Sequence, residues 1–170
     1  GLTDLNVSVD SLDPARFRRM TGSSRLSETL AGIEAAAACG FPVKTNATIL
    51  RDMNTDDIVP LLDFFGDRNI PVRYLEVMKM GPIRDSHKSL LFCEEEILER
   101  IQSRWSFRDL PRGRAATARY RVTDDGRIFG IIANHSEPFC GDCDRLRIDH
   151  KGAVYGCLSS AASFPLPQDP

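Results

Sequence analysis

The sequence predicts an α/β fold in which a parallel sheet is followed by a smaller α+β region. Strand-like and helix-like segments alternate up to residue 82, and one helix followed by two strands comes after it. Alternation of this kind is typical of parallel strands joined by right-handed crossovers. We therefore expect two parts, residues 1–82 and residues 83–170, with most of the cysteines in the second.

The first part contains three expected strands and two expected helices. Residues 3–9 alternate between apolar and polar side chains and predict a strand, as do residues 43–50 and 71–78. The expected helices have apolar side chains at helical spacing, namely Leu26, Leu30, Ile33 and Ala37 in residues 25–39, and Ile58, Leu61, Leu62 and Phe65 in the next helix. Gly40 is expected to end the first helix, and Asn54 to cap the second, with Asp57 in its first turn.

The second part has a different pattern. Residues 94–105 predict a helix, and residues 117–122 and 127–132 predict two strands. The Asp124-Asp125-Gly126 sequence between these strands is typical of a hairpin turn.

Polar side chains fall on one face of the first two strands. Buried parallel strands are usually apolar throughout, so a polar row indicates either the lumen of an open or partial barrel or short strands with solvated ends. The residues in question are Asn6, Ser8, Asp10, Lys44, Asn46 and Thr48.

Composition limits the class of protein. The chain is 42% hydrophobic and 27% charged with a net charge of −2, so no overall positive field attracts nucleic acid. No apolar run is long enough to span a membrane and no signal peptide is present, so we expect a cytoplasmic protein. An odd number of cysteines argues against a secreted disulfide framework, and we expect Cys39 and Cys93 to be small buried residues.

Three further cysteines form the sharpest motif of the chain. Cys140, Cys143 and Cys157 follow a C-x2-C-x13-C spacing, which is one ligand short of a closed zinc site. The candidates for a fourth zinc ligand are His150, His135 and Cys93. Three thiolates also suit an iron–sulfur cubane with one iron left open. Zinc, a cluster and no metal all stay open on spacing alone.

Two arginines follow the first cysteine pair. Arg145 and Arg147 are expected to point the same way from a strand, and their planar guanidinium groups suit phosphate or carboxylate oxygens. Pairing with the surface carboxylates Asp142, Asp144 or Asp149 is the more common role for such arginines.

Taken together, residues 5–13, 43–48, 72–78 and 138–158 resemble the GTP 3′,8-cyclase family of radical S-adenosylmethionine enzymes, also called the molybdenum cofactor biosynthesis protein A family. The resemblance covers essentially the whole chain. It implies the second half of a partial TIM-type (radical SAM) barrel, followed by a C-terminal region with an iron–sulfur site.

The resemblance also implies roles for individual residues. Cys140, Cys143 and Cys157 match the ligands of a C-terminal 4Fe–4S cluster whose open iron takes the guanine of GTP. The positions that match GTP contacts are Lys44, Arg73, Arg145 and Arg147, and those that match S-adenosylmethionine contacts are Ser8 and Met78. Arg73 and Met78 have opposite strand parity, so we expect Met78 to lie beyond the regular strand or after a bulge.

The implied activity is a lyase reaction that converts GTP to (8S)-3′,8-cyclo-7,8-dihydroguanosine 5′-triphosphate in molybdenum cofactor biosynthesis. The C-x3-C-x2-C motif that holds the S-adenosylmethionine-cleaving 4Fe–4S cluster in the family is absent from residues 1–170. We therefore expect an excerpt whose missing N-terminal half-barrel supplies that cluster, and a homodimer is a possible assembly. The alternatives are a non-catalytic cluster- or nucleotide-binding remnant and a related radical enzyme with another substrate.

Overall fold

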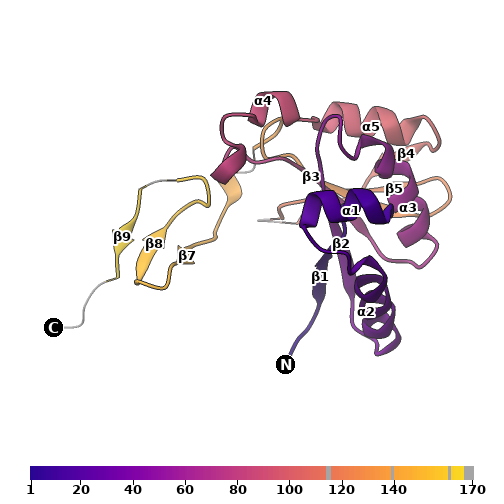
Figure 1. The fold of residues 1–170 in the computed structure, drawn as a ribbon, viewed down its shortest axis with the longest axis horizontal. Coiled ribbons are helices and arrows are strands. Elements are labelled where there is room, and N and C mark those ends of the chain that lie inside the picture. The colour runs from indigo at the N-terminus through magenta and orange to yellow at the C-terminus, as the bar shows by residue number, and fades with distance from the viewer. Residues whose placement is uncertain (114–115, 139, 161, 167–170) are drawn as a thin grey trace.

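A six-stranded mixed sheet forms the centre of the protein. The computed structural model describes residues 1–113, 116–138, 140–160 and 162–166 (Figure 1). The strand order is β1-β2-β3-β6-β5-β4, with parallel pairing from β1 to β6 and antiparallel pairing from β6 to β4. The strands are β1 (Leu5–Ser8), β2 (Val43–Ile49), β3 (Val72–Glu76), β4 (Phe107–Asp109), β5 (Arg119–Thr123) and β6 (Ile128–Ile132). The expected α/β class and the parallel strands of the first part are confirmed.

Five α-helices and three 3-10 turns are described. The α-helices are α1 (Pro14–Thr21), α2 (Leu26–Ala38), α3 (Ile58–Gly66), α4 (His87–Leu90) and α5 (Glu94–Gln102). The 3-10 turns are η1 (Thr55–Asp57), η2 (Gly81–Ile83) and η3 (Cys140–Asp142). No described helix is long and apolar enough to cross a membrane.

Helix α1 was not predicted, although its ends carry clear signals. The Asp13 carboxylate accepts a hydrogen bond from the Arg16 N–H at 2.6 Å, and Pro14 occupies the first turn. Gly22 ends the helix in the left-handed conformation at φ 73°. Phe17 is its one buried side chain, so the helix is too short to show a repeated apolar stripe.

Helix α2 ends as expected but packs slightly differently. Gly40 has φ 83°, and the following Phe41 N–H donates to the Ala36 carbonyl, which closes the helix. Ala36, rather than the predicted Ala37, lies against the core. The expectation that Cys39 is buried is wrong, because this residue follows the last turn of α2 and is exposed.

The prediction that the Asn54 side chain caps the next helix is also wrong. Asn54 precedes η1, but its side chain caps no helix. Its amide instead donates to the carbonyls of Asp10 and Thr48 at 2.8 and 2.9 Å, and its oxygen accepts from the Leu50 N–H at 2.8 Å. Asn54 is fully buried and ties together the chain just after β1 and the end of β2.

The two faces of the sheet differ in polarity, because successive side chains of a strand point to opposite faces. Helices α1, α2, α3 and α5 lie along one face (Figure 1). On that face β2, β3 and β6 bury Val43, Thr45, Ala47, Ile49, Val72, Tyr74, Glu76, Phe129 and Ile131. On the other face, here called the polar face, lie Asn6, Ser8, Lys44, Asn46, Thr48 and Arg73. The predicted sharing of one face by these side chains of β1 and β2 is confirmed.

The predicted hairpin is confirmed between β5 and β6. Gly126 has φ 92° in the turn, and the Thr123 N–H donates to the Arg127 carbonyl at 2.9 Å. Strand β6 then pairs in parallel with β3, so one sheet contains strands from both sides of residue 82 in the sequence. The division of the chain near residue 82 stays a prediction.

A small antiparallel sheet lies to one side of the main body (Figure 1). Its strands are β7 (Arg147–Ile148), β8 (Ala153–Tyr155) and β9 (Phe164–Pro165). Several large apolar side chains in and beside it are exposed, namely Leu146, Ile148, Leu158, Phe164 and Leu166.

Candidate metal and anion site

The three motif cysteines line one cavity of about 340 Å³, here called the cysteine cavity. Arg145 and Arg147 line the same space. The cavity lies beside the polar face of the sheet, because Leu75 near the end of β3 and Ile132 at the end of β6 also line it. Its remaining lining residues are Met78, Thr117, Asn134, Pro138, Gly156, Leu158 and Ser159.

Short local structure presents the thiols. Cys140 begins η3, and the Cys143 N–H donates to the Cys140 carbonyl at 3.3 Å, which turns both residues toward the same region. Cys157 follows β8, and its sulfur accepts from the Ser159 N–H at 3.4 Å. All three cysteines are exposed, and none forms a disulfide in the described structure. Phe139 of the motif lies outside the described residues.

The arginines influence the thiols electrostatically. Hydrogen bonds from the backbone and then the side chain of Arg145 lower the pKa of Cys143, with a smaller contribution from the charge of Arg147. Both arginines are half-buried, and only Arg147 belongs to β7. Asp149 accepts its hydrogen bonds from the Lys151 and Ala153 N–H groups and the Tyr155 hydroxyl. The side chain of Asp142 lies outside the described set.

The described residues of the cysteine cavity do not form a site for a single metal ion. Within the described ranges, no group of three His, Cys, Asp or Glu side chains is arranged to hold one metal ion. None of the candidates for a fourth zinc ligand lines the cysteine cavity in the described part of the chain. His135 lies in a neighbouring cavity, and Cys93 is the N-cap residue of α5. In a cubane the thiolates bind different irons, so they surround a cluster instead of meeting at one point.

The remaining predicted site residues lie in two places, the cysteine cavity and the polar face of the sheet. Met78 lies two residues after β3 and lines the cysteine cavity, which resolves its strand parity without a bulge. Ser8, Lys44 and Arg73 lie on the polar face of β1–β3 and are not among the described lining residues of that cavity.

Polar contacts hold the basic side chains of the polar face. The Lys44 Nζ lies 3.6 Å from an Asp4 carboxylate oxygen. Arg73 donates to the side-chain oxygens of Asn46 and Asn6 at 2.7 and 2.6 Å. Arg73 thus bridges β3 to β1 and β2 and is fixed in place on this face.

A buried carboxylate missed by the sequence analysis supports the wall of the site. Glu76 is 1% exposed and accepts hydrogen bonds from the N–H groups of Glu94, His135 and Ser136 at 2.8, 2.7 and 2.9 Å. The Ser136 hydroxyl donates to it as well. The first of these donors lies at the N-terminus of α5, where a negative charge is favoured. Glu76 therefore joins β3, α5 and the segment that leads to Cys140.

These observations define an α/β protein with a thiol- and arginine-lined cavity at the carboxyl ends of two parallel strands. The chain belongs to the family described as Molybdenum Cofactor Synthesis C, whose model matches residues 70–168.

Curated relatives extend the likeness over nearly the whole chain. A GTP 3′,8-cyclase of Corynebacterium glutamicum (strain ATCC 13032) is 38% identical over 175 residues, covering 98% of this chain and 46% of the relative. The GTP 3′,8-cyclase of Pseudomonas syringae pv. syringae (strain B728a) is 37% identical over 98% of this chain and 51% of its own length. That of Aquifex aeolicus (strain VF5) is 35% identical over 94% of this chain and 50% of its own length. The chain thus spans about half the length of these relatives.

Proposed function

We propose that this chain is the substrate-binding half of a GTP 3′,8-cyclase, a radical S-adenosylmethionine lyase of molybdenum cofactor biosynthesis. The product would be (8S)-3′,8-cyclo-7,8-dihydroguanosine 5′-triphosphate. The observation that carries the proposal is the meeting of three thiols and two arginines at one cavity, in a chain 38% identical to a GTP 3′,8-cyclase.

In this proposal Cys140, Cys143 and Cys157 hold a 4Fe–4S cluster. The exposed thiols all face the cysteine cavity, and the lowered pKa of Cys143 favours the thiolate form that binds iron. With three protein ligands, such a cluster supplies one iron that is open to a nitrogen or oxygen donor of the substrate.

In the same proposal, the two pairs of basic residues bind different parts of GTP. Arg145 and Arg147 hold the part of GTP that enters the cysteine cavity, where guanidinium groups suit its oxygen atoms. Lys44 and Arg73 on the polar face hold the triphosphate, and the asparagine contacts of Arg73 keep its guanidinium in position. Because hydrogen abstraction from the ribose needs close approach of the reacting atoms, positioning is the main task of these residues.

The S-adenosylmethionine contacts are assigned to Ser8 and Met78. Ser8 points from β1 to the polar face, and Met78 lies at the rim of the cysteine cavity. This arrangement supports two ligands held side by side over the polar face, which would be the lumen of a partial TIM-type barrel. The S-adenosylmethionine-cleaving cluster and the other half of that barrel would come from the segment of the relatives that this chain does not match.

Anaerobic iron–sulfur reconstitution tests the proposal. We expect about four iron and four sulfide ions per chain, because one cubane fits the three thiolates. Cys157→Ser should reduce the bound iron strongly, whereas Cys39→Ser, an exposed cysteine after α2, should leave it unchanged. Stoichiometric zinc without sulfide, or equal iron in both variants, would refute the cluster.

A further inference from the structure

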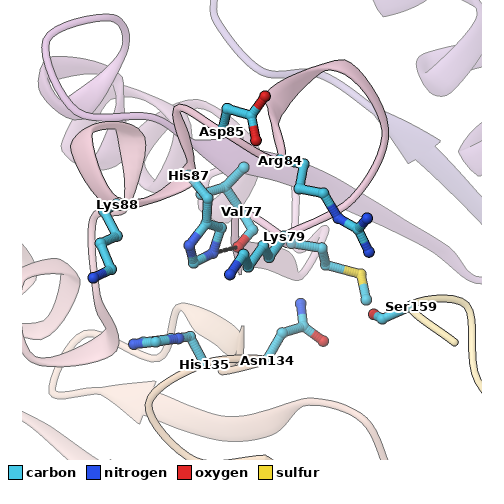
Figure 2. A pocket seen from close by; sticks show the side chains of 10 residues that line it. Val77, Lys79, Arg84, Asp85, His87, Lys88, Asn134, His135 and Ser159 are labelled. Carbon is cyan, nitrogen blue, oxygen red and sulfur yellow. Dashed lines mark hydrogen bonds between the residues drawn. The ribbon is translucent and has the colours of Figure 1, made fainter.

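A second and larger cavity lies next to the cysteine cavity. It has a volume of about 660 Å³ and is here called the basic cavity, because Lys79, Arg84 and Lys88 line it (Figure 2). Its other lining residues are Val77, Met78, Asp85, His87, Asn134, His135 and Ser159. Its volume falls within the usual range of small-molecule sites.

The three cations of the basic cavity, Lys79, Arg84 and Lys88, are exposed and have no carboxylate within the ion-pair distance of 4.0 Å in the described part of the chain. By contrast, Arg127 contacts three carboxylates and Arg121 contacts two. Asp85 is the one carboxylate on the described lining, so the described lining carries three cations and one carboxylate. A concave surface with an excess of cations favours an anionic ligand.

The walls of the basic cavity are held in place by buried contacts. His87 is 4% exposed, and its Nε2 donates to the Val77 carbonyl at 2.9 Å, which fixes the ring (Figure 2). On the opposite wall, Glu76 accepts the His135 N–H, and the Asn134 amide donates to the Glu76 carbonyl at 3.3 Å. The two imidazole rings stand 5.5 Å apart between their centres. A preformed cavity of this kind loses little entropy when a ligand binds.

We propose that the basic cavity binds the phosphate group of a small molecule through Lys79, Arg84 and Lys88. A phosphate presents several charged oxygens, which match one planar guanidinium and two mobile ammonium groups. The site goes beyond the proposed function, because none of these three residues is assigned there to GTP or S-adenosylmethionine. Met78, Asn134 and Ser159 line both cavities, so a ligand in the basic cavity would lie beside the one in the cysteine cavity.

Lysine acetylation provides a direct test, because two of the four lysines line the basic cavity and the other two lie elsewhere, of which Lys151 serves as the internal control. Lys79 and Lys88 line the basic cavity, Lys44 lies on the polar face, and Lys151 is exposed between β7 and β8. The chain is treated with an amine-acetylating reagent with and without pyrophosphate, at equal ionic strength set with sodium chloride. Acetylation at each lysine is measured by mass spectrometry.

We expect pyrophosphate to protect Lys79 and Lys88 in a saturable manner and to leave Lys151 unchanged. Arg84→Gln should raise the half-protecting concentration by about tenfold, as loss of one charge-assisted contact predicts. The matched control Arg100→Gln removes an exposed arginine of α5 and should have no effect. Unchanged acetylation of Lys79 and Lys88, or equal protection of Lys151, would overturn the proposal.

The same assay separates this site from the proposed GTP site. In the Arg145→Gln/Arg147→Gln double variant, protection of Lys79 and Lys88 by pyrophosphate should persist, and its loss would place the anion in the cysteine cavity and overturn the proposal. Guanosine 5′-monophosphate and orthophosphate are tested in parallel. Protection by orthophosphate alone assigns a free anion, and protection by the nucleotide assigns a nucleotide phosphate; both outcomes support a phosphate site.

Discussion

Arg145 and Arg147 lie just before and at the start of β7 and line the cysteine cavity. In the proposed function, each contributes a positive charge that binds GTP. We expect Arg145→Ala and Arg147→Ala each to weaken GTP binding to the reconstituted protein by about 10- to 100-fold, the range for one charged hydrogen bond. Isothermal titration calorimetry measures the affinity. Arg100→Ala on the exposed side of α5 serves as the control. Unchanged affinity in both cavity variants would contradict a role for these arginines in GTP binding.

Asp10 gives a prediction about pH. Burial raises the pKa of its carboxyl, and the hydrogen bond from the Thr48 N–H lowers it by less. Because the folded pKa lies above the unfolded one, Asp10 contributes stability below its unfolded pKa, and that contribution is lost as the pH rises through the folded pKa. Asp10→Asn keeps an acceptor for Thr48 and carries no charge.

We therefore expect Asp10→Asn to be more stable than the wild type at about pH 7, with the difference disappearing at about pH 3. Urea unfolding followed by circular dichroism at several pH values measures the midpoint. Asp124→Asn, on the exposed hairpin turn, is the matched control. A variant that is less stable at neutral pH would show that the negative charge of Asp10 stabilises the fold.

At the scale of elements, Glu76 links β3, α5 and the segment before Cys140. Glu76→Gln removes the charge and places an NH₂ group where the structure presents N–H donors, so one donor loses its acceptor. We expect a loss of about 2–4 kcal/mol in the free energy of unfolding, as for a buried charged group left unpaired. Urea unfolding measures it, and Glu99→Gln on the exposed face of α5 should have little effect. Equal stability of the two variants would contradict the role given to Glu76.

The elements with a clear repeat could be predicted from the sequence. Strands β1, β2 and β3, helices α2, α3 and α5, and the β5–β6 hairpin all have apolar side chains at strand or helix spacing, or a Gly-containing turn. Strands β4, β7, β8 and β9 have two or three residues each, which is too short for a period. The sequence also misled at Asn54, because its buried amide found backbone partners in two other segments instead of a helix end.

The candidate site was predictable only where its residues are close in sequence. The motif cysteines and arginines lie within residues 140–157, so their common cavity could be expected. The basic cavity combines residues 77–88, 134–135 and 159, which only the fold brings together. Lys44 and Arg73 come from strands far from the cysteines in sequence, and the described structure places them on the polar face and not on the lining of the cysteine cavity, so their part in a GTP site stays a prediction.

At the scale of the whole molecule, the exposed apolar surface around β7–β9 predicts self-association. Ile148 and Phe164 are 61% and 69% exposed, and β1 is an uncovered sheet edge in the described structure. Exposed apolar patches and unpaired edges favour association between copies. We expect sedimentation velocity to show concentration-dependent oligomers, which Ile148→Lys/Phe164→Lys should reduce. A sharply melting monomer at all concentrations would contradict this prediction.

The position of β6 has a consequence for the order in which the protein folds. Strand β6 pairs with β3 on one side and with β5 on the other, although residues 77–127 separate it from β3 in the chain. During synthesis, the outer edge of β3 therefore stays open until residue 132 has left the ribosome. Closing so long a loop is slow compared with forming local contacts. The β5–β6 hairpin can form first and dock as a unit, and this docking step would bring the segment that leads to Cys140 to its place beside β3.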